Sequence, residues 1–212
     1  MSLLRVSALR TLYILIVAFA ACLARSRGTT TWKVHITLLK YAAVRDDLGI
    51  RLAVGKRLDW ILATWDQSSS AFIKKMHGKK FTRPSTLSFL RIMHDGEKKA
   101  LALLTRRQTM RLRQISLQYW GASDLENPVT AKSVGLTKGQ VSKLNHFEVK
   151  QLTKMFSGWP KDPTAKAVQL ATTGKARQVN MEEYARQLLT RTQWKAWLRL
   201  QGRPFPFLKE IK

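Results

Sequence analysis

The side chains that could carry acid–base or nucleophilic chemistry are few in this 212-residue chain. There are only 13 acidic residues, and the sequence shows no Gly-rich phosphate loop and no nucleophile elbow. The adjacent acids Asp46 and Asp47, like Glu182 and Glu183, would point in different directions on a helix instead of converging as a catalytic pair does. We therefore expect no enzyme active site and no cofactor.

The histidines give no indication of a metal site. A helical metal site places two ligands one turn apart, and no histidine here has a partner at that spacing. We expect four ordinary surface or packed residues: His35, His77, His94 and His146.

Cations dominate the charge of the chain, with 38 Lys and Arg and a formal net charge of +25. Surfaces that are charged only for solubility usually mix both signs, so this excess favours anionic partners. Arg106 and Arg113 are expected to project away from the apolar side of their helix, which Leu112 and Ile115 mark. The two densest basic stretches predict a partner-binding surface formed by Lys74, Lys75, Lys79, Lys80, Arg83, Arg106, Arg107, Arg111 and Arg113.

Several anionic partners fit this composition. Acidic or unfolded polypeptides are one class, and the anionic surfaces of a cell envelope are another. Nucleic acid is the alternative, because Trp120 or Trp159 near the basic stretches could stack on bases, although no nucleic-acid-binding module is recognisable. Most tryptophans are expected to be packing anchors, since they stand at or near apolar helical positions: Trp60, Trp65, Trp194 and Trp197.

Helices must position these surfaces, and their starts are marked by a repeated motif, L-T-x-x-Q. A Thr that caps a helix while a Gln three residues later bonds back to it forms a capping box. The motif occurs three times, as Leu104, Thr105 and Gln108; as Leu136, Thr137 and Gln140; and as Leu189, Thr190 and Gln193. A fourth copy keeps Ile50 at the leucine position but has Arg51 and Val54 in place of Thr and Gln.

The four copies share a predicted buried face and indicate a duplicated unit. Eight residues after the leucine position stand Leu58, Leu112, Leu144 and Trp197. The copies at Ile50 and Leu136 lie 86 residues apart, and those at Leu104 and Leu189 lie 85 apart. Gly49 and Gly135 precede the motif in both halves, which suits the C-cap of a short helix.

The period is helical nearly throughout, and no convincing strand pattern is present. We therefore expect an all-α protein of two tandem antiparallel helical hairpins with capped long helices, after an N-terminal signal segment. The hairpin units are predicted at residues 33–120 and 121–212. The sequences HGKKFTRPST (77–86) and GWPKDPT (158–164) are expected to form the hairpin turns, and the Pro-containing tail from Gly202 is expected to pack as irregular chain.

The first 24 residues have the form of a secretory signal peptide. Arg5 and Arg10 precede the apolar run TLYILIVAFAACLA, which is short for a membrane span. Export to the periplasm or another extracytoplasmic compartment follows, with an uncleaved anchor as the alternative. Cys22 is the only cysteine, and FAAC loosely resembles a lipoprotein cleavage box; Phe19 fits that box poorly, so lipidation is not favoured.

The segments LTRRQ, LTKGQ and LTRTQ, behind a signal peptide in a basic helical chain, resemble the LTxxQ-motif family of bacterial extracytoplasmic proteins, the Spy/CpxP-like group. The resemblance covers roughly residues 36–205. It implies antiparallel helical hairpins and, for the best-known members, ATP-independent holding of unfolded envelope proteins or a role in envelope-stress sensing. This chain is longer than those members and would be a duplicated one.

Overall fold

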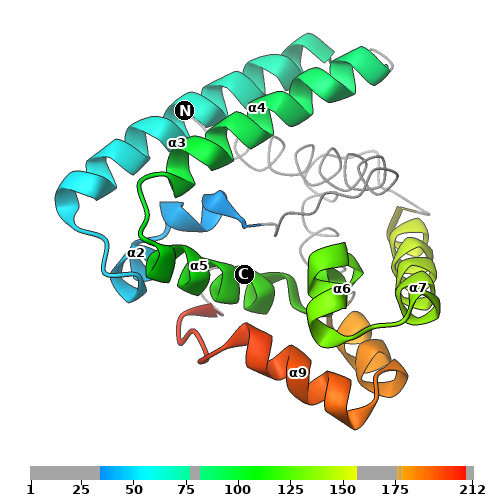
Figure 1. Ribbon diagram of the computed structural model, residues 1–212. Helices are drawn as coiled ribbons and strands as arrows, with labels where there is room; N and C mark the ends of the chain where they lie inside the picture. Colours follow the sequence, from blue (N-terminus) through cyan, green and yellow to red (C-terminus); the bar gives the residue numbers. More distant parts are fainter. Residues whose placement is uncertain (1–33, 77–81, 157–175, 177, 209–212) are drawn as a thin grey trace. The chain divides into compact units, whose positions relative to one another are not determined.

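The computed structural model describes residues 34–76, 82–156, 176 and 178–208 (Figure 1). All regular structure in these residues is helical, and none of them lies in a strand. The prediction of an all-α fold is therefore confirmed. The chain divides into two compact units, which we call the N-terminal unit, described at 34–119 and 203–208, and the C-terminal unit, described at 120–202, with the gaps given above.

The N-terminal unit begins with two short helices and continues with longer ones. The first short element, η1, is a 3-10 helix with Ile36, Leu38 and Leu39 buried. The elements are η1 (Ile36–Lys40), α2 (Ala42–Asp47), α3 (Leu52–Met76), α4 (Arg83–Leu101) and α5 (Arg106–Trp120).

Helices α3 and α4 lie side by side along their length (Figure 1). Only six residues separate the end of α3 from the start of α4, so the pair is antiparallel. Gly96 of α4 permits their close approach, because a Cβ atom at this position would lie 2.1 Å from Cδ1 of the buried Trp65. A larger residue at position 96 could not pack against Trp65 without displacing one of the two helices.

Helix α4 starts with a capping box that the sequence analysis missed. The Oγ1 atom of Thr82 accepts from the backbone N–H of Ser85, and the Ser85 hydroxyl oxygen accepts from the N–H of Thr82. Pro84 lies in the first turn, where a missing N–H costs nothing. The proline that was expected to belong to a turn therefore helps to start a helix.

The C-terminal unit repeats the order of a 3-10 helix, a short α-helix and a longer one. The backbone is helical again at 178–188, and the ring of Tyr184 in that stretch stacks on Phe147 of α7, with ring centroids 4.1 Å apart. Its other elements are η2 (Gly121–Glu126), α6 (Pro128–Val134), α7 (Lys138–Phe156) and α9 (Arg191–Gln201).

The buried face predicted from the repeated motif is present in both units. Leu58, Leu112, Leu144 and Trp197 are all 0% exposed. Their shared offset from the motif therefore marks the core positions of four different helices. Burying such side chains is the dominant favourable contribution to folding.

The two glycines before the motif end short helices as expected. Gly49 has a φ of 61° and Gly135 a φ of 76°, a left-handed conformation that favours glycine. The next residue then bonds back across the turn: Ile50 donates to the carbonyl of Arg45 and Leu136 donates to that of Ala131, both at 2.9 Å. The same turn therefore occurs at positions 86 residues apart.

The tail after Gly202 packs on the N-terminal unit, whereas the sequence analysis placed it in the second hairpin unit. Phe205 is 3% exposed, and its backbone N–H donates to Oε1 of Gln118 at 2.8 Å. Gln118 in return donates to the carbonyl of Arg203 at 2.8 Å. These contacts confirm that the tail packs.

Several predictions concern residues outside the described part of the chain. These are the signal segment at 1–24 with Cys22, His77, Trp159 and the second hairpin turn at 158–164. The tandem arrangement of two hairpins stays a prediction.

Candidate functional site

Each of the three complete L-T-x-x-Q motifs forms the predicted capping box. The backbone N–H of Gln108, Gln140 and Gln193 donates to the preceding threonine hydroxyl at 3.1–3.2 Å. The Oε1 atom of each glutamine accepts from the backbone N–H of that same threonine at 2.9–3.0 Å. The motif therefore starts helices α5, α7 and α9 as the sequence predicted.

The amide nitrogen of the glutamine has a second role that the sequence did not reveal. Nε2 of Gln108 donates to the carbonyls of Leu48 and Gly49 at 3.1 and 3.4 Å. Nε2 of Gln193 donates to the carbonyl of Gly135 at 2.7 Å. Gln108 and Gln193 thus each join the start of their own helix to the glycine turn that precedes another helix of the same unit.

In the C-terminal unit two copies of the motif face one another. Nε2 of Gln140 lies 2.9 Å from Oε1 of Gln193, and Nε2 of Gln193 lies 3.0 Å from Oε1 of Gln140. Gln140 also donates to the carbonyl of Leu188 at 3.2 Å. Because both amides bond to backbone and to each other, this pair is a structural joint and offers little to a ligand. The N-terminal unit has Val54 at the position of Gln140 and so lacks the pair.

The predicted basic surface is present only in part. Lys74 and Lys75 are exposed at the end of α3, and Arg106 and Arg107 are exposed in the first turn of α5. Lys79 and Lys80 lie outside the described residues, as does the side chain of Arg83.

Arg111 and Arg113 do not belong to an exposed surface. They are 8% and 7% exposed, so the prediction that Arg113 projects into solvent is wrong. Helix α5 is covered on a wider arc than its apolar residues indicated, because Ser116 is buried as well. The aliphatic stems of arginines can line such a face.

Arg111 is part of an ion-pair cluster that fixes the tail. Its Nε and Nη2 atoms lie 2.6 and 3.3 Å from the two carboxylate oxygens of Asp47. Arg203 reaches the same carboxylate at 2.9 Å, and Arg111 donates to the carbonyl of Arg203 at 2.7 Å. Asp47, a member of one adjacent acid pair, is thus a structural residue and is not available to a partner.

Other acids are also used within the fold. Arg45 bonds to Asp59 and lowers the pKa of that carboxyl group, Asp66 pairs with Lys40, and Oε2 of Glu182 accepts from the N–H of Ala122 at 3.1 Å. Burial raises the pKa of Glu97, although a backbone hydrogen bond from Val34 opposes the shift. The buried acids include Glu126 and Glu148, each 6% exposed.

The cations have the opposite distribution. In the described part of the C-terminal unit, Glu183 is the only acid classed as exposed. The exposed cations of that unit are Lys132, Lys138, Lys143, Lys150, Arg186, Arg191, Lys195 and Arg199. The described surface of this unit therefore carries an excess of positive charge where a partner would meet it.

Exposed apolar side chains accompany these cations. Trp60 is 67% exposed on α3, one turn from Lys56 and Arg57, so the expectation that it packs in the core is wrong. Trp65 and Trp197 are buried as expected, and Trp194 is partly exposed with the Arg186 guanidinium 5.3 Å from its ring centroid. The remaining large exposed apolar residues are Leu52, Leu87, Met110, Val149, Val179, Leu198 and Phe207.

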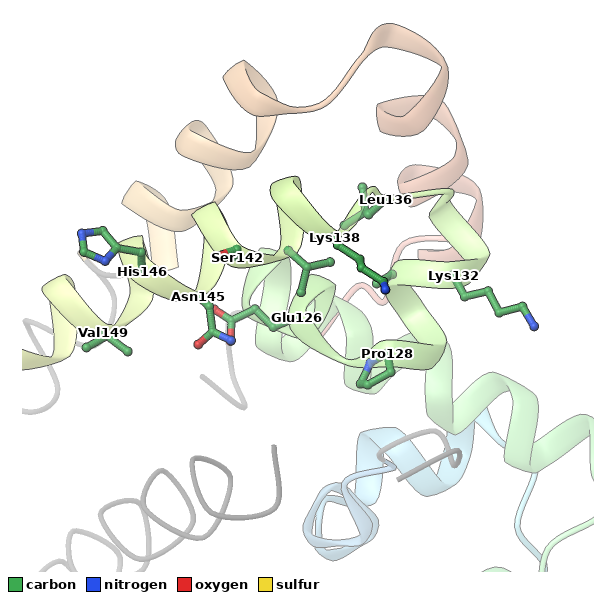
Figure 2. Close-up of a pocket in the computed structure, with 11 residues that line it drawn as sticks. Glu126, Pro128, Lys132, Leu136, Lys138, Ser142, Asn145, His146 and Val149 are labelled. Carbon is green, nitrogen blue, oxygen red and sulfur yellow. The ribbon is translucent and has the colours of Figure 1, made fainter. Parts of the chain in front are cut away.

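A cleft of about 790 Å³ lies within the C-terminal unit, among η2, α6 and α7 (Figure 2). Lys132 and Lys138 line it near Leu136, and His146 and Val149 line it farther along α7 (Figure 2). The side chains of Glu126 and Asn145 point toward one another between these ends (Figure 2). The remaining lining residues are Pro128, Ala131, Val141 and Ser142. Sequence reasoning did not identify this cleft.

The described residues contain no group of three or more His, Cys, Asp or Glu that could hold a metal ion. His94 and His146 are exposed, and His35 donates its backbone N–H to Oγ of Ser116 at 3.2 Å. Within the described ranges, no helix has the length and apolar character needed to cross a membrane.

Comparison with known proteins gives no relative: no family model matches the sequence, and no curated protein or solved structure matches it significantly. The resemblance to the LTxxQ group therefore stays a prediction.

Proposed function

We propose that this protein is an exported binding protein that holds unfolded or acidic polypeptides, in the manner of the Spy/CpxP-like chaperones. The observation that carries the proposal is the charge of the described surface of the C-terminal unit, where eight cations but only one acid, Glu183, are exposed. A partner that approaches this surface meets positive charge with few competing carboxylates.

The exposed apolar residues complete this argument. Unfolded clients present both apolar and charged side chains, and a holding protein must contact both kinds without folding around one sequence. Leu198 is 46% exposed on α9, on the same helix as the exposed Arg191, Lys195 and Arg199. Arg191, Lys195 and Arg199 recur every four residues, so they form a stripe along one side of that helix.

The experiment that tests the proposal is aggregation of a reduced, acidic client protein, followed by light scattering. The purified protein is expected to suppress scattering at equal or lower molar ratios, and suppression should weaken as salt increases. Its matched comparison is a basic client of similar length. Suppression of neither client would contradict the proposal, and equal suppression of both would contradict the role that it gives to the cationic surface.

Nucleic acid is the second candidate, and Trp60 favours it. Proteins that bind single-stranded nucleic acids stack exposed aromatic side chains on the bases and place cations near the phosphates, and the exposed Trp60 beside two cations offers both. A fluorescent oligonucleotide added to the aggregation assay separates the two candidates. Tight, salt-sensitive oligonucleotide binding without client protection, together with its loss in Trp60→Ala, would make nucleic acid the partner.

A further inference from the structure

The cleft of the C-terminal unit has a counterpart in the N-terminal unit, and the counterpart is filled. Residues 86 apart occupy equivalent positions, as the matching glycine turns at Gly49 and Gly135 demonstrate. The short helices α2 and α6 correspond, and so do the first turns of α3 and α7. The face of α7 that lines the cleft therefore corresponds to a face of α3 that includes Gly55 and Asp59.

In the N-terminal unit the side chain of Arg45 fills this groove. Its Nε atom donates to the carbonyl of Leu39 at 2.5 Å, and its Nη2 atom lies 2.5 Å from Oδ1 of Asp59. Its Nη1 atom lies 3.8 Å from where a Cβ atom on Gly55 would be. The arginine crosses from α2 to α3 and occupies the space between them, and it is only 19% exposed.

We call the Arg45 side chain the plug, and the C-terminal unit lacks it. Ala131 occupies the position of Arg45, Asn145 that of Asp59 and Val141 that of Gly55. All three residues line the cleft. A methyl group cannot span the distance that the arginine bridges, so the groove remains open between α6 and α7.

The charges around the groove have changed with the plug. Lys132 stands at the position of Asp46, and Lys138 stands at the position of Leu52. Asp59, whose carboxylate pairs with Arg45, is replaced by Asn145, whose amide is neutral. The carboxylate that remains in the lining, Glu126, is 6% exposed, while both lysines are exposed. The exposed charge of the lining is therefore positive at this end of the cleft, and the apolar Leu136 and Val141 line the same cleft.

We propose that this cleft binds an acidic segment of another polypeptide, with a carboxylate at the Lys132 and Lys138 end and an apolar side chain against Leu136 and Val141. Charge complementarity selects the occupant. In the counterpart groove the Arg45 cation pairs with Asp59. In this groove the neutral Asn145 stands in place of that acid, and Lys132 and Lys138 carry positive charge at one end. The inference rests on the proposed function, since it assigns one place where an acidic polypeptide is held.

The chain supplies the design of the test. Ala131→Arg combined with Asn145→Asp rebuilds in the cleft the plug that the N-terminal unit already has, and it leaves the net charge unchanged. The matched control, Ser133→Arg with Gln187→Asp, adds the same two charges at exposed positions outside the cleft. A second variant, Lys132→Glu with Lys138→Glu, reverses the rim at two exposed side chains and is expected to fold even where the plug disturbs packing.

The probe is a labelled peptide of alternating Glu and Leu, titrated into the full protein and followed by fluorescence anisotropy. We expect the plugged variant and the rim variant each to weaken binding by about tenfold or more, as loss of two charge contacts and the apolar seat would give. The control should stay within about twofold of the original protein. Unchanged peptide affinity in both cleft variants would overturn the proposal.

Running the aggregation assay on the same samples separates this proposal from the proposed function. If the original protein suppresses aggregation but does not bind the peptide, or if the cleft variants bind it normally, the cleft proposal fails and the proposed function remains. If the original protein neither suppresses aggregation nor binds the peptide, both fail. An oligonucleotide that binds more tightly than the peptide and loses affinity in the same variants would replace the polypeptide as the occupant.

Discussion

Gln193→Glu separates the two roles of the motif glutamine. A glutamate at the third helical position still accepts from the N–H of Thr190, so the capping box is retained. It cannot donate to the carbonyl of Gly135 or to Oε1 of Gln140, which Nε2 now reaches at 2.7 and 3.0 Å. The substitution therefore removes the joint and leaves the cap.

The expected cost follows from these contacts. Two lost hydrogen bonds contribute about 1 kcal/mol each, and a carboxylate facing two oxygens adds about 1 kcal/mol. A negative charge near the start of α9 returns about 0.5 kcal/mol. The free energy of unfolding should fall by roughly 2.5 kcal/mol, which lowers the melting temperature by about 5–10 °C for a protein of this size.

The assay is thermal and urea unfolding followed by circular dichroism, with Gln187→Glu as a control on an exposed helical position. Acid adds a second test. Facing two oxygens raises the pKa of the new carboxyl group at 193 in the folded protein, so the folded state binds its proton more tightly than the unfolded state does. The stability deficit should therefore shrink as the pH falls through that folded-state pKa. A Gln193→Glu protein as stable as the control at neutral pH would refute the reasoning.

Three further predictions concern packing, burial and export. Gly96→Ala should destabilise the protein by about 1–3 kcal/mol despite the better helix propensity of alanine, because its Cβ would overlap Trp65. Gly139→Ala should be neutral or stabilising in the same melting experiment, because its Cβ has space. Shifts of the same sign and size in both variants would contradict this prediction. Glu97→Gln should stabilise the protein at neutral pH, because the raised pKa of Glu97 in the folded protein costs stability as the pH rises through it. The gain should vanish in melts below pH 4.5, the ordinary pKa of a glutamic acid, and a gain that persists there would contradict the burial argument. Mass spectrometry of the protein recovered from a bacterial periplasm should find a chain lacking the first 24 residues, and an intact N-terminus would favour the anchor instead.

Local signals in the sequence predicted much of the fold. The caps at Thr105, Thr137 and Thr190 depend on atoms within one turn, so their spacing was sufficient. The same is true of the glycine turns and of the core positions that stand eight residues into each helix. The helical period predicts which residues share a face, and one apolar residue such as Leu144 indicates which face is buried.

The features that were predicted wrongly, or not predicted at all, depend on contacts between distant segments. The second bond of Gln193 requires Gly135, which is 58 residues away. Arg111 is buried because Asp47 and the tail meet it, and no helical period can indicate those partners. The exposure of Trp60 and the open cleft at Ala131 have the same origin, since each depends on which neighbouring helix covers the face.

The exposed cationic surface is proposed to hold acidic polypeptide chains. The most direct measurement of this is the affinity for two permanently unfolded chains of equal length and matched apolar content, one acidic and one basic, at low and high salt. The acidic chain is expected to bind with an affinity that falls as salt rises, while the basic chain is expected not to bind. Equal affinity for both chains, or an affinity for the acidic chain that salt does not change, would contradict it.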